Sequence, residues 1–148
     1  MEELDVEKIC EILNRVMEYE LAGVVRYTHY SLMVRGPHRL PIVDFMRGQA
    51  TESLVHAQQA GEIITGLDGH PNQGIAHIEE THRHDIHALL SESLEHEVTA
   101  LDLYKEFLGE VQGVSVYLEE YARQMIGLEE LHTLELRKML RDYEPRSG

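Results

Sequence analysis

The sequence predicts an all-α fold: an antiparallel four-helix bundle with a long crossover between the second and third helices. Three observations predict it. Apolar residues recur at helical spacing in four segments, glycine and proline separate these segments, and no segment shows the alternation of a strand. The chain of 148 residues is long enough for one substantial core, so we expect residues 1–148 to form a single domain.

The first two helices are expected at about residues 5–34 and 41–67. Asp5 is a suitable N-cap for the first helix, and Gly36 followed by Pro37 is a strong signal for its end. Because the connection between these helices is short, we expect them to be antiparallel neighbours.

The third helix is expected to begin between residues 81 and 85 and to end at about Leu108, where Gly109 and Gly113 break it. Ser115 can cap the fourth helix. This connection is also short, whereas the segment between the second and third helices is long enough to cross the bundle. The sequence therefore predicts two helical hairpins joined by a crossover.

The composition limits the partners of the protein. The chain has 27 Asp and Glu against 13 Lys and Arg, and binding to nucleic acid or to an anionic membrane surface needs clustered cations. No apolar run approaches the roughly 20 residues of a membrane span, and the acidic start is unlike a secretory signal. The single cysteine, Cys10, excludes an intramolecular disulfide and favours a reducing compartment. We therefore expect a soluble, cytoplasmic protein that binds neither nucleic acid nor membrane.

Polar side chains interrupt the apolar faces of all four predicted helices. Each lies near the middle of its helix, so in an aligned bundle these side chains should meet at one depth near the axis. An unpaired buried carboxylate is costly, so such a group requires a hydrogen-bonding network or a bound cation. The residues concerned are Glu20, His56, Glu97, Glu129 and His132.

The spacing of these residues favours a metal centre. Glu129 and His132 form a Glu-x-x-His pair, which places a carboxylate and an imidazole on adjacent turns of one helix face, about 4.5 Å apart along the axis. The pattern alone is common, but the chain repeats its polar residues, and core packing explains repeated Glu and His poorly. Bundles with carboxylate-bridged di-iron centres use such a set. In each half a Glu precedes a Tyr by seven residues, and a His follows on the next helix: Glu20, Tyr27 and His56, then Glu97, Tyr104 and His132.

With these residues in view, the sequence resembles bacterioferritin, within the ferritin-like superfamily. The resemblance covers about residues 5–143. It implies a di-iron centre that oxidises Fe(II) with oxygen or peroxide, and a homo-oligomeric shell that stores the ferric mineral. By position, Glu20, His56, Glu97, Glu129 and His132 match metal ligands, and Tyr27 matches a phenol beside them; Glu20, Glu97 and Tyr27 are the residues expected to serve catalysis. The resemblance is carried by four segments, at 20–27, 56–57, 69–72 and 129–132.

One departure from the family pattern concerns the ligands. The family has Glu three residues before its first ligand histidine, but here that residue is Ser53. Glu52 lies about 40° from His56 around a helix, on the side opposite to Ser53, so it either reaches the metal from that flank or faces solvent. We include Glu52 among the expected metal ligands. Without it the site would be mononuclear, asymmetric or slow.

Two further departures concern haem and assembly. The haem-ligating methionine of the family would fall at Leu54, which has no donor atom, so no haem of that type is expected. The chain ends at 144–148, where bacterioferritin carries a fifth helix that lines an axis of its 24-subunit shell. A dimer or a smaller shell is therefore expected as readily as the full shell.

Three functions remain open from the sequence. The leading hypothesis is an iron-binding ferroxidase, although the same ligands also suit manganese or zinc. The alternatives are a di-iron oxidase or oxygenase that acts on a small organic substrate, and a metal-free helical interaction module. Five histidines at 70–87 are expected to lie in a solvated loop, with a surface metal site as the alternative.

Overall fold

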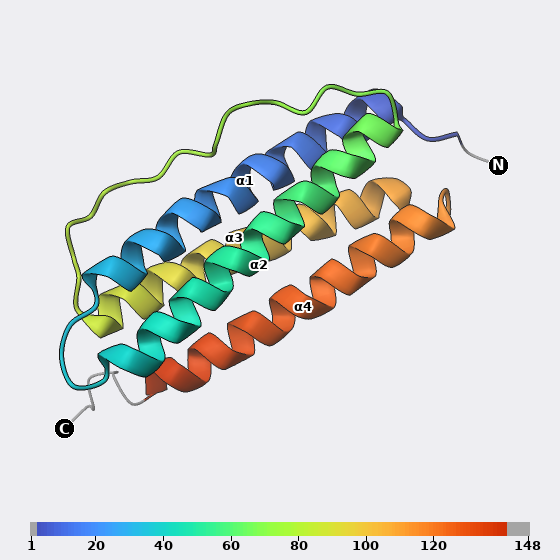
Figure 1. Cartoon of the computed structure of the whole chain (residues 1–148). Helices are drawn as coiled ribbons and strands as arrows, with labels where there is room; N and C mark the ends of the chain where they lie inside the picture. The colour runs from blue at the N-terminus through green and yellow to red at the C-terminus, as the bar shows by residue number, and fades with distance from the viewer. Residues whose placement is uncertain (1–2, 142–148) are drawn as a thin grey trace.

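The computed structural model describes residues 3–141 and confirms the all-α four-helix bundle (Figure 1). Its helices are α1 (Val6–Met33), α2 (Arg39–Gly66), α3 (Ile86–Val111) and α4 (Val116–Arg141). None of these helices, in the part of the chain that the structure describes, combines the length and the hydropathy needed to cross a membrane. The tail at 144–148, where no fifth helix was expected, lies outside the described residues.

The predicted helix starts are confirmed by side-chain caps. Asp5 Oδ1 accepts a hydrogen bond from the Lys8 amide, and Ser115 Oγ accepts one from the Leu118 amide. Each bond satisfies an amide that the first turn of a helix leaves free. Asp85 caps α3 in the same way, so that helix begins at the end of the predicted interval.

The prediction that Gly109 breaks the third helix was wrong, because α3 continues through it to Val111. A glycine inside a helix costs only about 1 kcal/mol relative to alanine. Val111 is fully buried in the apolar cluster below, and its packing holds the last turn in place. The second helix begins at Arg39, two residues before the predicted start, since a proline is tolerated in a first turn, where amides have no helical partner.

The helices form two antiparallel hairpins, as predicted. Helix α1 packs against α2 and α3, and α3 packs against α4. Within residues 3–141 the Cα atoms of α2 and α4 stay more than 8 Å apart, so only long side chains span the space between them. The crossover at 67–85 runs along α1 for most of its length (Figure 1). Asn14 fixes it there by donating to the His70 carbonyl and accepting from the Asn72 amide.

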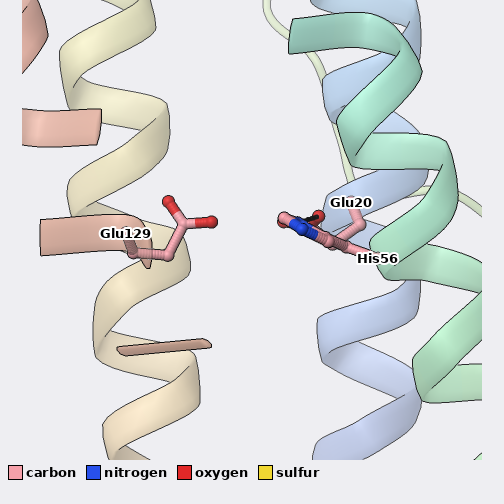
Figure 2. A group of neighbouring side chains, drawn as sticks. All are labelled: Glu20, His56 and Glu129. Atoms are coloured by element: carbon pink, nitrogen blue, oxygen red, sulfur yellow. Dashed lines mark hydrogen bonds and ion pairs between the residues drawn. The ribbon is translucent and has the colours of Figure 1, made fainter. Parts of the chain in front are cut away.

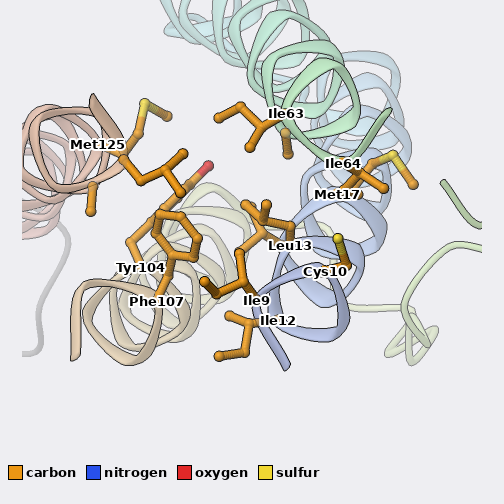
Figure 3. Close-up of a cluster of buried hydrophobic side chains, with 14 of the residues drawn as sticks. Ile9, Cys10, Ile12, Leu13, Met17, Ile63, Ile64, Tyr104, Phe107 and Met125 are labelled. Atoms are coloured by element: carbon orange, nitrogen blue, oxygen red, sulfur yellow. The ribbon is translucent and has the colours of Figure 1, made fainter. Parts of the chain in front are cut away.

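Two apolar clusters fill the ends of the bundle. One contains the amino-terminal half of α1, the carboxyl-terminal parts of α2 and α3 and the start of α4 (Figure 3). The other is built around Tyr27, Met46, Leu89, Leu90 and Leu136 at the opposite end. The polar residues singled out from the sequence belong to neither cluster and form the layer between them.

Candidate metal centre

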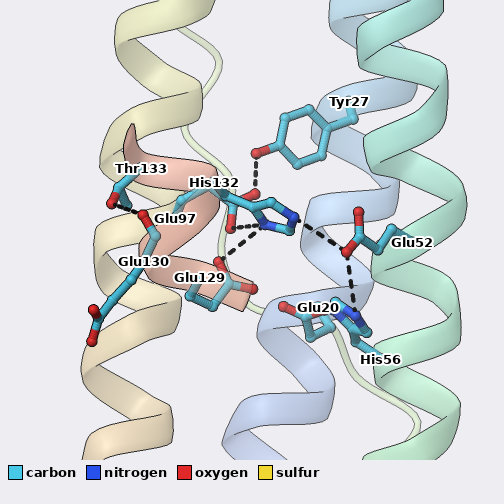
Figure 4. Close-up of polar contacts among 9 residues, drawn as sticks. All are labelled: Glu20, Tyr27, Glu52, His56, Glu97, Glu129, Glu130, His132 and Thr133. Carbon is cyan, nitrogen blue, oxygen red and sulfur yellow. Dashed lines mark hydrogen bonds and ion pairs between the residues drawn. The ribbon is translucent and has the colours of Figure 1, made fainter. Parts of the chain in front are cut away.

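The structure brings the predicted ligands together from all four helices (Figure 4). The buried carboxylates come from α1, α3 and α4, the imidazoles from α2 and α4, and the partly exposed carboxylate of Glu52 from α2. Glu20, Glu97 and Glu129 are only 3%, 3% and 1% exposed, and His56 is 5% exposed. Glu130, which shares the Glu-x-x-His motif, is exposed and points away from this group.

One group of possible ligand atoms combines Glu20, His56 and Glu129 (Figure 2). Glu20 Oε2 lies 3.0 Å from His56 Nδ1, and the ligand atoms of the three residues all lie within 4.8 Å of one another. The atoms around a tetrahedral ion with bonds of about 2.0–2.2 Å are roughly 3.3–3.6 Å apart. Small side-chain adjustments therefore suffice for these three residues to hold one ion.

A second group combines Glu97, Glu129 and His132. His132 Nδ1 lies 3.7 Å from Glu97 Oε2 and 3.6 Å from Glu129 Oε2. Glu129 belongs to both groups, so a carboxylate from α4 stands between the two possible metal positions. Shared carboxylates of this kind are typical of di-iron bundles.

Glu52 extends toward this centre, with its side chain 34% exposed, and lies on the side of the imidazoles away from the buried carboxylates. Its Oε1 lies 3.2 Å from His132 Nε2 and 3.7 Å from His56 Nε2 (Figure 4). Each imidazole therefore has Nδ1 beside the buried carboxylates and Nε2 beside Glu52. A carboxylate on the second nitrogen of a ligand histidine fixes the tautomer and the ring orientation.

Tyr27 and Tyr104, which each follow a glutamate of the centre by seven residues, differ in their hydrogen bonds. The Tyr27 hydroxyl donates to Glu97 Oε1 and so orients that carboxylate. The Tyr104 hydroxyl is buried without a hydrogen-bond partner among the described residues. The two halves of the centre are therefore not equivalent.

Two buried polar atoms at the centre have no hydrogen bond, although buried polar groups in proteins normally have one. Glu129 Oε2 and His132 Nδ1 are buried with no hydrogen-bond partner in the described part of the chain. An unsatisfied buried carboxylate oxygen is costly. A cation between Glu129 and His132 would satisfy both atoms, and the oxygen and nitrogen donors are those that iron, manganese and zinc accept. The residues present therefore fit a metal ion.

The electrostatics of the two halves also differ. Burial raises the pKa of Glu20 well above its ordinary value, and the charge of Glu97 raises it further. Burial likewise raises the pKa of Glu129. Burial alone would lower the pKa of His132, but Glu129, Glu52 and Glu97 raise it to about 12, whereas burial lowers the pKa of His56. The carboxylates therefore act more strongly on His132 than on His56.

Sequence reasoning missed one buried residue of this layer, His96. It is 3% exposed and stacks on Tyr19 with ring centroids 4.4 Å apart. Burial lowers its pKa to about 4, so it is neutral at pH 7. A signal was present, because His96 directly precedes Glu97 as Tyr19 directly precedes Glu20. The positions before the two glutamates therefore both carry an aromatic ring, and these two rings stack on each other.

Gly23 leaves room on α1 for both His96 and Ser53. A Cβ atom added to Gly23 would lie 2.9 Å from both His96 Nε2 and Ser53 Oγ. Ser53 therefore packs against α1 at Gly23, in a space that a longer side chain would overfill.

The chain matches the family model of the ferritin-like domain over residues 10–144. It belongs to the ferritin-like family. No curated protein matches it in sequence. Its structure is similar to that of a ferritin-like, di-iron-carboxylate protein from Bacillus anthracis str. Ames, with a TM-score of 0.87 and 23% identity over 95% of this chain and 99% of that one.

Two bacterioferritin-related structures are also similar to this ferritin-like protein. A dodecameric thioferritin, the bacterioferritin-related protein from Bacteroides fragilis, has a TM-score of 0.88 and 23% identity over 95% of this chain and 89% of that one. Rhodobacter capsulatus bacterioferritin, described with a metal-free dinuclear site and a haem iron, has a TM-score of 0.80 and 25% identity over 96% of this chain and 88% of that one. The predicted resemblance to bacterioferritin within this superfamily is confirmed.

Proposed function

We propose that this ferritin-like protein binds two iron ions at its centre and oxidises Fe(II), with iron storage or detoxification as the outcome. The observation that carries the proposal is the convergence of three buried carboxylates and two Nδ1 atoms in two groups that share Glu129. The ligands would be Glu20 and His56 for one ion and Glu97 and His132 for the other, with Glu129 common to both. Iron bound there would supply the redox chemistry: two Fe(II) give the two electrons that reduce oxygen to peroxide, or peroxide to water.

Each residue at the centre has a role that follows from its contacts. The carboxylates of Glu20, Glu97 and Glu129 neutralise the charge of the ions in a layer closed by apolar clusters on both sides. Tyr27 holds the Glu97 carboxylate through its hydroxyl, which leaves Glu97 Oε2 facing His132.

We propose that Glu52 supports the centre from the Nε2 side of both histidines. Direct ligation, the role expected from the sequence, would require its carboxylate to leave both Nε2 atoms. In the arrangement seen here Glu52 keeps both Nδ1 atoms directed at the metal positions.

We further propose that the protein works as a homo-oligomer. The similar protein from Bacteroides fragilis is dodecameric. Large apolar side chains are exposed on the helices of this chain, including Leu32, Leu40 and Leu134 at 65%, 77% and 56%. Burying such side chains at subunit contacts would remove them from water. Native mass spectrometry should give a multiple of the 17.0 kDa chain, and a monomer would contradict this.

The test of the main proposal is Fe(II) oxidation by the metal-free protein in air. The wild type should oxidise added Fe(II) faster than buffer, and a Glu97→Ala/Glu129→Ala double variant should not. Glu130→Ala is the matched control, since Glu130 is an exposed glutamate beside the centre, and its oxidation rate should equal that of the wild type. Equal rates in the wild type and the double variant would refute the proposal.

A second candidate function is oxidation of a small organic substrate by the same centre. A groove lined mainly by residues of α2 and α4 includes Val55 and Gln59, which are one and three residues from His56 along α2, and it also includes Tyr117 and Tyr121. Such a groove would give a substrate access near the metals. Iron loading distinguishes the functions: a hollow oligomer filled with ferric mineral favours storage, and loaded protein without mineral favours the oxidase. Protein purified without bound metal, and unable to bind any, would leave only the interaction module.

A further inference from the structure

A group of three histidines lies outside the central layer, where the crossover meets α1. His29 extends from α1, and His82 and His84 extend from the crossover just before α3. The ring centroids of His29 and His84 are 5.7 Å apart, and those of His82 and His84 are 6.4 Å apart. All three line one pocket of about 120 Å³.

These separations suit imidazoles that share one metal ion. Metal–nitrogen bonds are about 2.0–2.1 Å and the ring centre lies roughly 1.2 Å beyond the nitrogen, so two imidazoles on one ion have ring centres about 5 Å apart at a tetrahedral angle and up to about 6.4 Å apart when opposite. The pair His29 and His84 falls inside this interval. His82 lies 6.4 Å from His84, at the upper limit, and in the arrangement seen here the donor atoms of the three histidines do not all lie within 4.8 Å of one another. His82 is exposed, so rotation of its side chain can bring it closer.

The backbone that carries the two crossover histidines is fixed. The Thr81 hydroxyl donates to the Glu92 carboxylate on α3 and accepts from the Arg83 amide. His82 has a φ of +57°, in the left-handed region that histidine enters more readily than most residues. The bond to Glu92 ties the segment to α3 and reduces the ordering cost of binding an ion.

The charges around the pocket also suit a cation. Glu79, Glu80 and Glu92 line it against Arg26 and Arg83, so its carboxylates outnumber its guanidinium groups. The whole chain has a net charge of −14, which raises the local concentration of cations.

We propose that His29, His82 and His84 bind a divalent transition-metal ion at the surface of the protein. Imidazole donors favour zinc, copper, nickel, cobalt and ferrous iron over magnesium or calcium. The site is separate from the central one, because His29 lies nine residues beyond Glu20 on α1, about 13 Å along the helix axis. It therefore does not depend on the proposed oxidation of iron.

The experiment compares zinc binding by the wild type with that of two matched double variants. His29→Asn/His84→Asn removes the two closest ligands, and His77→Asn/His87→Asn removes two nearby histidines that do not line the pocket. Equilibrium dialysis against Zn²⁺ followed by elemental analysis gives the number of ions per chain, and isothermal titration calorimetry gives their affinity. Fe(II) oxidation by each protein reports on the central site.

The first variant should bind one zinc ion fewer per chain than the wild type, and the control variant should bind as many as the wild type. His82→Asn alone should weaken this ion about tenfold or more. Oxidation of Fe(II) should be the same in all of these proteins. The proposal is overturned if His29→Asn/His84→Asn binds as much zinc as the wild type, or if both double variants lose zinc equally.

Discussion

The role of Glu52 at the candidate metal centre depends on the positions of single atoms. One oxygen, Oε1, lies near the Nε2 atoms of both histidines, while the Nδ1 atoms face Glu20, Glu97 and Glu129. An imidazole that donates a hydrogen bond from one ring nitrogen to a carboxylate has its other ring nitrogen free to bind a metal. Substitution of Glu52 by glutamine keeps an acceptor oxygen but removes the charge. Its effect on metal affinity should therefore differ according to whether Glu52 supports the histidines or binds the metal directly.

Replacing Glu52 separates these two roles. If Glu52 orients the imidazoles, Glu52→Ala should weaken Mn²⁺ or Co²⁺ binding by about 10–100-fold, and Glu52→Gln should lose much less, because its amide oxygen still accepts from Nε2. Metal affinity measured by competition with a chelator gives both values. Glu130→Ala should leave affinity unchanged. Equal losses for Glu52→Gln and Glu52→Ala would instead indicate a direct ligand.

The two buried tyrosines give a second contrast. Tyr27→Phe removes the hydroxyl that donates to Glu97, so it should lower the rate of Fe(II) oxidation and destabilise the fold by about 1–3 kcal/mol. Tyr104→Phe removes a buried hydroxyl that has no hydrogen-bond partner among the described residues, so it should leave stability unchanged or raise it. Urea unfolding and oxidation kinetics check both variants. An equal effect of the two substitutions would contradict the assigned hydrogen bond.

The helices approach one another closely at Gly23, where α1 meets side chains of α2 and α3. Ser53 and His96 occupy the space that a Cβ atom on Gly23 would need. Gly127 on α4 is also inside a helix, but a Cβ atom there would have no neighbour within 4 Å. The two glycines have the same helix propensity and different surroundings, so their substitution measures the close approach itself.

Alanine substitutions at these glycines should therefore have opposite signs. Gly127→Ala should raise the free energy of unfolding by about 0.5–1 kcal/mol, because alanine favours the helix. Gly23→Ala should lower it by about 1–3 kcal/mol, since His96 is stacked on Tyr19 and cannot move aside freely. Chemical unfolding of the metal-free protein measures both values. Stabilisation by Gly23→Ala would show that the helices can separate there without cost.

The positions of the four helices could be predicted from the sequence more accurately than the side-chain contacts between them. Periodicity and caps identified all four helices, because the apolar faces are long and regular. Gly109 was misjudged, because packing of Val111 outweighs a single unfavourable residue. The side on which Glu52 approaches the histidines depends on side-chain rotamers, which residue spacing does not determine. His96 was not predicted to be buried because it precedes Glu97 by one residue, which places it 100° around the helix from that inward-facing glutamate.

At the scale of the whole molecule, the candidate metal centre connects α2 and α4, whose backbones are otherwise well separated. The Cα atoms of α2 and α4 in the described residues stay more than 8 Å apart, yet Glu52 on α2 reaches His132 on α4, and Glu129 on α4 approaches His56 on α2. The three central carboxylates are buried at an energetic cost that a cation would offset. A bound metal should therefore stabilise the bundle as a unit.

Removal of the metal from the intact protein tests whether a bound metal stabilises the bundle. With Mn²⁺ at about 100 times its dissociation constant, the folded state should gain about 2.7 kcal/mol. For a chain of this size that corresponds to a rise in Tm of roughly 5–10 °C, which EDTA should abolish. Glu129→Gln should lose most of the rise. In EDTA the same variant should be at least as stable as the wild type, because it replaces a buried carboxyl group by a neutral amide of similar volume. A variant that melts lower than the wild type by the same amount with and without metal would show that Glu129 serves packing rather than metal binding.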